Sequence, residues 1–203
     1  NINSGYQMVV NAVNTFADLD ILQESCGRGC TVEHLSNHSL IALQGPFAAT
    51  ALAKIAPEIS DMRFMDVRSL ELVGAACTVS RSGYTGEDGF EFYYQSDQPE
   101  LVWQSLLVSG KPHGIAPCGL GARNTLRLEA KMLLYGNDID NTTTPLEAGL
   151  GWITELNKGP FIGREAIVKQ KADGISRKFT LLLLSVLYYL KDLWTLFMNR
   201  KTD

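Results

Sequence analysis

The clearest alternation of polar and apolar residues in the chain falls at residues 90–94, which read Phe-Glu-Phe-Tyr-Tyr. A period of two predicts a strand with Phe90, Phe92 and Tyr94 on one face. Glu91 then projects from the opposite face, close to the start of the strand. The pattern therefore predicts a sheet with one aromatic face and one face that carries a carboxylate.

Further runs rich in apolar and β-branched residues also predict strands. They are residues 6–11, 31–32, 40–43, 64–73 and 75–81. We expect residues 31–32 and 40–43 to pair as a hairpin that turns at residues 36–39. Gly74 separates the last two runs and predicts a turn between them.

Helical spacing and capping residues predict four helices between these strands. The first begins at Asn14 or Thr15 and runs to about Gln23, the second follows Gly45-Pro46 and stops before Pro57, the third spans residues 97–110, and the fourth runs from Gly119 to Gly136. Strands and helices in this order predict an α+β fold.

Length, charge and composition narrow the classes of function. The 203 residues allow one or two domains, and a hydrophobic share of 45% is enough for a sizeable core. The net charge is −4, and no block of basic residues occurs. Because phosphate binding needs clustered Lys and Arg, we expect no nucleic-acid partner.

The cysteines and histidines raise the question of a metal site. Cys26, Cys30, His34 and His38 recur at intervals of four, which on a helix would place possible zinc ligands on one face. Glycines within this segment break such a helix, so we expect free thiols and surface histidines instead. A second candidate, with acidic residues at 138 and 140, lacks the remaining oxygen ligands of a calcium loop. We therefore expect no metal.

Three glycines, at positions 83, 86 and 89, lie between the predicted strands 75–81 and 90–94. So many glycines in one loop indicate unusual backbone angles or close approach of a ligand to the main chain. Glu91 lies beside this loop, and an ionised carboxylate only accepts hydrogen bonds. It suits a ligand edge that presents two adjacent N–H donors.

Two arginines, Arg123 and Arg127, lie four residues apart on the predicted fourth helix and would share one face. Taken alone, such a pair indicates a solvated surface. Gly119 and Gly121 at the start of the same helix would let a partner approach the backbone, which favours a binding role.

Three segments together resemble aminomethyltransferase, the T protein of the glycine cleavage system: residues 83–91, 119–130 and 134–140. The resemblance covers roughly residues 6–178. It implies a folate-binding, aminomethyltransferase-type domain at 1–178, with antiparallel or mixed sheets flanked by helices, followed by a divergent apolar tail at 179–203.

The resemblance also implies a reaction and its site residues. Enzymes of this family pass the carbon of an aminomethyl group, carried on the lipoyl arm of a partner (the H protein), to tetrahydrofolate and release ammonia. By resemblance Glu91 holds the amino edge of the pterin, Arg123 meets polar atoms of the folate, and Tyr84 packs against it or hydrogen-bonds to it. Asn11 belongs to residues 9–12, which read VVNA as in the family, and by resemblance it would line the pocket. Alternatively, Asn11 only caps or turns the chain.

Two other functions within the same superfamily stay open. One is a folate-binding module without turnover. The other is a factor of iron–sulfur assembly or tRNA modification, but that branch carries a Cys in a KGCYxGQE run where this chain has Pro160.

No catalytic residue is identified in this sequence. The family's acidic positioning residue belongs to a DD run before the VVNA segment, and residues 1–10 contain no Asp or Glu. The family's C-terminal domain is also unrecognisable after residue 178, so we expect this chain to be a fragment without turnover.

The apolar run at residues 179–190 is shorter than the roughly 20 residues of a membrane span, and we expect no membrane partner. The resemblance implies the cytoplasm for a bacterial protein and the mitochondrial matrix for a eukaryotic one.

Overall fold

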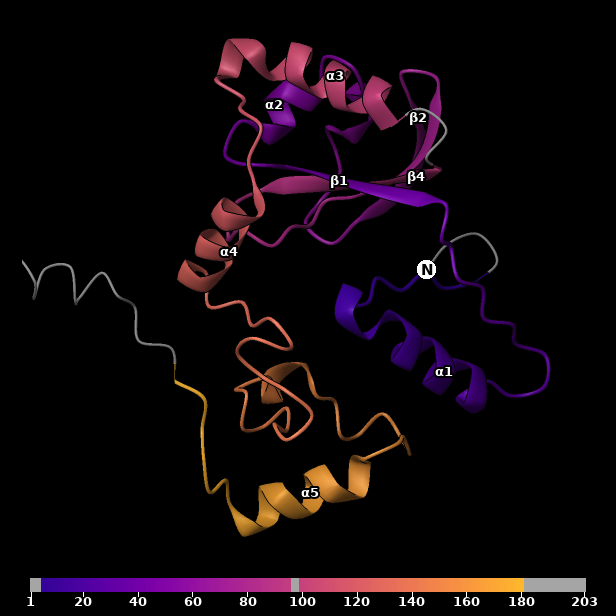
Figure 1. Ribbon diagram of the computed structural model, residues 1–203, viewed down its shortest axis with the longest axis vertical. Coiled ribbons are helices and arrows are strands. Elements are labelled where there is room, and N and C mark those ends of the chain that lie inside the picture. Colours follow the sequence, from indigo (N-terminus) through magenta and orange to yellow (C-terminus); the bar gives the residue numbers. More distant parts are fainter. Residues whose placement is uncertain (1–4, 96–98, 181–203) are drawn as a thin grey trace, which may run out of the picture. The chain divides into compact units, whose positions relative to one another are not determined.

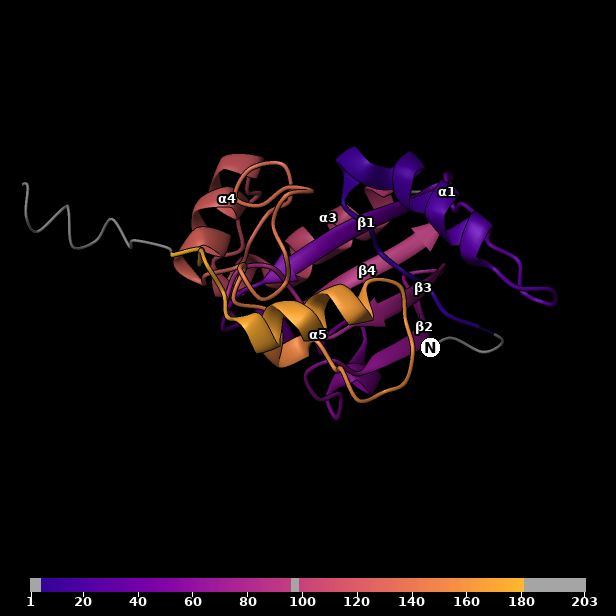
Figure 2. The ribbon, with the colours of Figure 1, turned by 90° about the horizontal axis from the view of Figure 1, so that it is seen from below.

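An antiparallel sheet of four strands is the centre of the fold, in the order β1-β4-β3-β2. The strands are β1 (His38–Gln44), β2 (Val67–Leu72), β3 (Ala75–Ser80) and β4 (Gly89–Gln95), and Figure 2 shows them side by side. β4 lies inside the sheet, with β1 on one side from His38↔Gln95 to Gln44↔Gly89 and β3 on the other. The predicted strand at residues 90–94 and the α+β class are confirmed.

The structure, a computed structural model, describes residues 5–95 and 99–180 (Figure 1). The chain divides into two units, residues 1–132 and 133–203. The helices of the first unit are η1 (Ala12–Asn14), α1 (Thr15–Ser25), α2 (Ala48–Leu52), η2 (Pro57–Ile59), α3 (Pro99–Gly110), η3 (Lys111–His113) and α4 (Leu120–Glu129); those of the second are η4 (Gly151–Ile153) and α5 (Arg164–Asp173).

The core of the first unit lies between the aromatic face of β4 and the helices α2 and α3 (Figure 1). Phe90 and Phe92 are fully buried and Tyr94 is 2% exposed. Leu52 of α2 and Val102 of α3 belong to the same buried cluster. Each such side chain contributes about 1.5–3 kcal/mol on burial, so this contact fixes the face of β4 and sends Glu91 to the other side.

The connection between β2 and β3 is a two-residue turn. Val73 and Gly74 both have positive φ, 46° and 84°, as a type I′ hairpin turn requires. The sequence predicts a turn at Gly74, and the structure confirms it.

The predicted strand at residues 6–11 is wrong. This segment is not in a strand, and Tyr6 is 87% exposed. β1 and β2 form the edges of the described sheet, and neither pairs with this segment. A strand without a ladder partner gains nothing from its β-branched residues.

The hairpin predicted between residues 31–32 and 40–43 is also wrong. Residues 40–43 do form a strand, but β1 pairs along its whole length with β4. A ladder of this length offers many more backbone hydrogen bonds than the short run at 31–32 can supply.

Two helices differ from their predicted limits. α2 begins at Ala48, because Pro46 and Phe47 form a turn before it. α4 ends at Glu129 rather than at Gly136, since Lys131 takes the left-handed conformation with φ of 60°. The prediction that this helix continues from residue 130 to Gly136 is therefore wrong.

The second unit is built mainly from loops held by side chains. Glu147 is 7% exposed and accepts hydrogen bonds from Arg177 Nε at 3.0 Å and from the backbone N–H of Thr144 at 2.8 Å. These contacts lower the pKa of Glu147, with Arg177 the largest cause. Asp140 accepts from Thr142, so it is part of the same loop structure.

Across residues 5–95 and 99–180, the structure contains no helix with the length and apolar character that crossing a bilayer requires. Residues 181–190 of the predicted apolar run at 179–190, and residues 97–98 of the predicted third helix, lie outside the described residues.

Candidate functional site

Glu91 lies on β4 with its side chain half-buried on the face opposite the aromatic residues. Its Oε2 accepts a hydrogen bond from the Ser82 hydroxyl at 2.6 Å and another from the Tyr93 hydroxyl at 3.2 Å. Both donors lie beside the glycine-rich loop or on the same strand. The carboxylate that the sequence singles out is therefore held by side chains close to it in the chain.

The glycine-rich loop before β4 is closed by an ion pair. Arg81 donates from Nε and Nη2 to the two carboxylate oxygens of Asp88, at 2.9 and 2.7 Å. This two-pronged hydrogen bond is the main cause that lowers the pKa of Asp88. Arg81 also lies 5.3 Å from the ring centroid of Phe90, so the loop is tied to the core strand.

Gln44, the last residue of β1, fastens the same loop from the other side. Its amide nitrogen donates to the carbonyl of Ser82, and its amide oxygen accepts from the hydroxyl of Thr85, both at 3.1 Å. A Cβ on Gly83 would lie 1.8 Å from the Gln44 side chain, and a Cβ on Gly89 would lie 2.4 Å from it. These two glycines make room for Gln44.

Gly86, the middle glycine, has a different role. Its φ is 81°, and a Cβ there would lie 2.8 Å from the Cβ of Ala130. The loop therefore passes very close to the C-terminal end of α4. Side chains other than glycine would be strained there and would also meet Ala130.

Tyr84 and Arg123 are brought together by this approach. The guanidinium carbon of Arg123 lies 4.5 Å from the centroid of the Tyr84 ring. This is a cation–π contact, which orients both side chains. Tyr84 is half-buried, whereas Arg123 is exposed. Two of the four predicted site residues are thus in direct contact.

Arg127 does not share the environment of Arg123, contrary to the expectation of one common face. It is 1% exposed, and it donates to Asn124 at 2.8 Å and to the carbonyl of Met132 at 3.0 Å. A buried guanidinium needs such acceptors. Helical spacing alone did not show that Met132, just after α4, would accept a hydrogen bond from Arg127.

Asn11 caps the short helix η1, where its Oδ1 accepts from the backbone N–H of Val13 at 3.1 Å. This is the capping role that the sequence left open. Its expected contact with folate stays a prediction.

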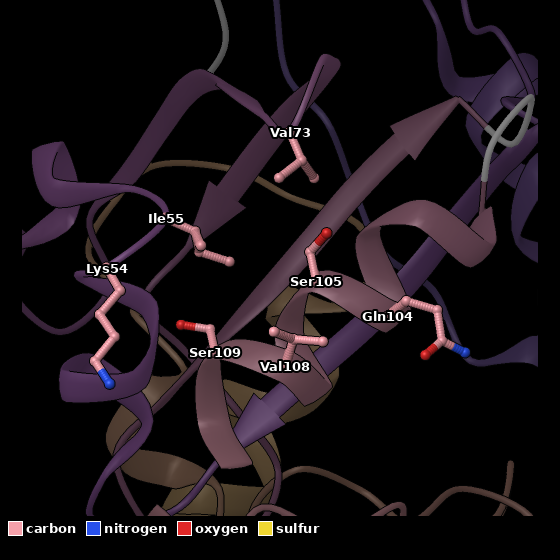
Figure 3. Close-up of a pocket in the computed structure, with 7 residues that line it drawn as sticks. All are labelled: Lys54, Ile55, Val73, Gln104, Ser105, Val108 and Ser109. Atoms are coloured by element: carbon pink, nitrogen blue, oxygen red, sulfur yellow. The ribbon is translucent and has the colours of Figure 1, made fainter. Parts of the chain in front are cut away.

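The structure also contains a cavity of about 430 Å³ beside the helices α2 and α3 (Figure 3). Lys54, Ile55, Val73, Gln104, Ser105, Val108 and Ser109 line it. None of the four predicted site residues is among them.

Gln44, Ser82 and Tyr93 are the residues that sequence reasoning missed. Tyr93 shares the face of Glu91 in the alternating pattern, and Ser82 borders the loop, so the sequence could have indicated both as neighbours of Glu91. The sequence could not have indicated Gln44, because its hydrogen-bond partner Ser82 lies 38 residues away along the chain. Within the described ranges, no group of three or more His, Cys, Asp or Glu residues is placed to hold a metal ion.

Comparison with known protein families assigns the domain that contains the sheet, the glycine-rich loop and the helix α4. The chain belongs to the GCVT N-terminal domain family, which matches residues 2–158.

The curated relatives that this chain resembles are aminomethyltransferases. The chain is 45% identical over 175 residues to an aminomethyltransferase of Halothermothrix orenii, covering 85% of this chain and 49% of that protein. It is 44% identical over 173 residues to an aminomethyltransferase of Pseudothermotoga lettingae, covering 84% and 48%. The chain thus spans about half the length of the curated relatives it matches.

A solved structure agrees with these relatives. The crystal structure of glycine cleavage system aminomethyltransferase T from Bartonella henselae superposes with a TM-score of 0.75 at 36% identity. The match covers 83% of this chain and 46% of that one.

Proposed function

We propose that this chain is the folate-binding part of an aminomethyltransferase of the glycine cleavage system. The reaction passes the carbon of an aminomethyl group from a lipoyl carrier protein to tetrahydrofolate and releases ammonia. The identity to aminomethyltransferases over most of the chain supports this assignment. The single structural observation behind it is that Glu91 lies at a loop fixed on both sides, in the same unit as the Tyr84–Arg123 pair.

Each residue has a role that its chemistry permits. Glu91 accepts hydrogen bonds from the N–H edge of the pterin. Arg123 has five donors and meets polar atoms of the folate, while Tyr84 packs against the ligand. Asn11 lines the pocket. The contribution of these residues is positioning and electrostatics, and no covalent nucleophile is required.

The lipoyl carrier protein is the proposed macromolecular partner, since it brings the aminomethyl group. Tetrahydrofolate is a co-substrate in this scheme, and no metal takes part.

Calorimetric titration with tetrahydrofolate tests the binding role. We expect the parent chain to bind, and Glu91→Gln to lose about 1.5–3 kcal/mol of binding free energy, because a charge-assisted hydrogen bond becomes a neutral one. Glu87→Gln is the matched control, since Glu87 is an exposed carboxylate in the same loop. We expect its affinity to equal that of the parent. Equal affinities for the parent and Glu91→Gln would remove Glu91 from the site.

A chimera tests the activity. This chain would replace the residues that it matches in the Halothermothrix orenii aminomethyltransferase, and all residues of that protein outside the match are kept. We expect ammonia release from aminomethyl-lipoyl carrier protein that depends on tetrahydrofolate. A folded chimera that binds tetrahydrofolate but releases no ammonia would instead favour a folate-binding module without turnover.

A further inference from the structure

Two hydroxyl groups hold one oxygen of the Glu91 carboxylate. Within residues 5–95 and 99–180, the hydrogen bonds that the Glu91 side chain accepts both end on Oε2, from Ser82 at 2.6 Å and from Tyr93 at 3.2 Å. A carboxylate has about four lone-pair sites, two on each oxygen. The two hydroxyls thus occupy Oε2, and Oε1 is the oxygen that can meet a ligand.

The hydroxyl of Ser82 is oriented by a second serine. Ser82 uses its only proton toward Glu91, so in its 2.8 Å contact with Ser80 the donor must be Ser80. Ser80 lies on β3 and is 9% exposed. A chain of hydroxyls from β3 therefore ends on the Glu91 carboxylate.

The hydroxyl of Tyr93 stays protonated at neutral pH and can therefore donate a hydrogen bond. Burial raises the pKa of the Tyr93 phenol, and the adjacent Glu91 carboxylate raises it further. The phenol thus keeps its proton and can donate to Oε2 whenever Glu91 is ionised.

We propose that Ser82 and Tyr93 are positioning residues, which hold Oε2 of Glu91 and so aim Oε1 at the N–H edge of the pterin. This inference rests on the proposed function. A free glutamate side chain must lose rotamer freedom when it binds a ligand, and that loss weakens binding. Here the hydroxyls restrict the side chain during folding, before the ligand arrives.

A double-mutant cycle with tetrahydrofolate as the probe tests this coupling. By titration calorimetry on the full chain, we expect Ser82→Ala and Tyr93→Phe each to raise Kd about three- to tenfold. In the Glu91→Ala background, we expect the same two substitutions to change Kd by less than about twofold, because they act through Glu91.

Two control variants separate positioning from general stability. Tyr94→Phe also removes a hydroxyl from β4, but one that faces the other way and donates to the carbonyl of Pro99. We expect its Kd to equal that of the parent. Ser82→Thr keeps the hydroxyl, and we expect it to restore most of the affinity that Ser82→Ala loses.

The outcomes distinguish this inference from the function on which it rests. If the parent binds tetrahydrofolate but Ser82→Ala and Tyr93→Phe bind as tightly as the parent, the positioning role is wrong and the proposed function stands. Equal losses in the parent and Glu91→Ala backgrounds would also reject the positioning role. If the folded parent does not bind tetrahydrofolate, both proposals fail.

Discussion

The glycines of the loop before β4 illustrate how one residue type serves different purposes. The sequence attributes all three to backbone freedom or a nearby ligand. In the structure Gly83 and Gly89 accommodate the Gln44 side chain, and only Gly86 combines a positive φ with a close contact to α4. Counting glycines therefore located the loop but could not explain each position.

Alanine substitutions at these glycines should rank in a defined order. Gly89→Ala meets both the Gln44 side chain and the backbone oxygen of Leu43, at 2.4 and 2.6 Å. Gly83→Ala displaces only the flexible end of Gln44, at a cost of about 1–3 kcal/mol for its lost hydrogen bonds. We expect Gly89→Ala to destabilise more than Gly83→Ala in urea unfolding.

Gly121→Ala is the control, because nothing lies within 4 Å of its Cβ position on α4. We expect it to stabilise by up to about 1 kcal/mol through helix propensity. A Gly89→Ala variant as stable as Gly121→Ala would contradict the packing described for Gln44.

Asp88 makes part of the stability depend on pH. Its pKa is lowered in the folded state, chiefly by the hydrogen bonds from Arg81, from an ordinary value of 3.8. A depressed carboxyl pKa gives stability that is present above the unfolded pKa and is lost as pH falls through the folded pKa. We expect the melting temperature of Asp88→Asn to lie below that of the parent at pH 7.

The difference between the two melting temperatures should shrink below about pH 4, where Asp88 begins to take up a proton in the unfolded parent. It should disappear as pH falls through the lowered pKa of Asp88 in the folded parent. Asp173→Asn is the control, since it removes an exposed pair with Lys169 that contributes little. A gap between the parent and Asp88→Asn that stays constant down to pH 2.5 would show that the ion pair does not stabilise the loop.

At the scale of elements, the sequence predicted strands with a clear alternation of polar and apolar residues and turns that contain glycine. It did not predict which strands pair with each other. The 90–94 strand and the Gly74 turn were predictable because each depends on neighbouring residues. The ladder between β1 and β4 depends on two distant segments, so the sequence instead favoured a local hairpin for residues 40–43. For the candidate site, motifs led the sequence analysis to propose Glu91, Tyr84 and Arg123, and the structure brings Tyr84 and Arg123 into contact. The contact of Gln44 with the loop could not be predicted, because it joins segments that are distant in sequence.

A substitution in the turn between β2 and β3 should raise the stability of the protein. Val73 is β-branched and has φ of 46°, a conformation that costs side chains other than glycine about 1–2 kcal/mol. Asn tolerates this conformation, and Asn-Gly is the preferred pair for this turn. We expect Val73→Asn to stabilise by about 1 kcal/mol and to raise the melting temperature by roughly 2–4 °C.

Val73→Ala is the control, because alanine is also strained at positive φ. We expect it to give no rise in melting temperature. A rise with Val73→Ala equal to that with Val73→Asn would mean that the valine side chain, and not the turn conformation, limits stability.

At the scale of the whole molecule, apolar side chains remain on the surface of the first unit. Tyr6, Met8, Val9, Val13 and Phe16, which we call the exposed apolar segment, are each at least 60% exposed. Exposed apolar surface promotes association. The chain spans about half the length of its curated relatives, and it displays these residues to solvent.

We therefore expect the purified chain to bind a hydrophobic dye and to associate as its concentration rises, measured by light scattering. Replacing Val9 and Phe16 by Ser should reduce both signals, whereas Ala17→Ser on the same helix should leave them unchanged. A clean monomer that binds no dye would show that this surface is too scattered to drive association.

The position of β4 between β1 and β3 has a consequence for how the molecule folds. β2, β3 and β4 follow one another along the chain and can pair through short connections, but β1 must close the long loop from Gln44 to Gly89 before it can join β4. Long loops are slow to close. Gln44 can fasten the glycine-rich loop only once β1 has docked, so we expect the surroundings of Glu91 to be among the last parts of the first unit to become ordered.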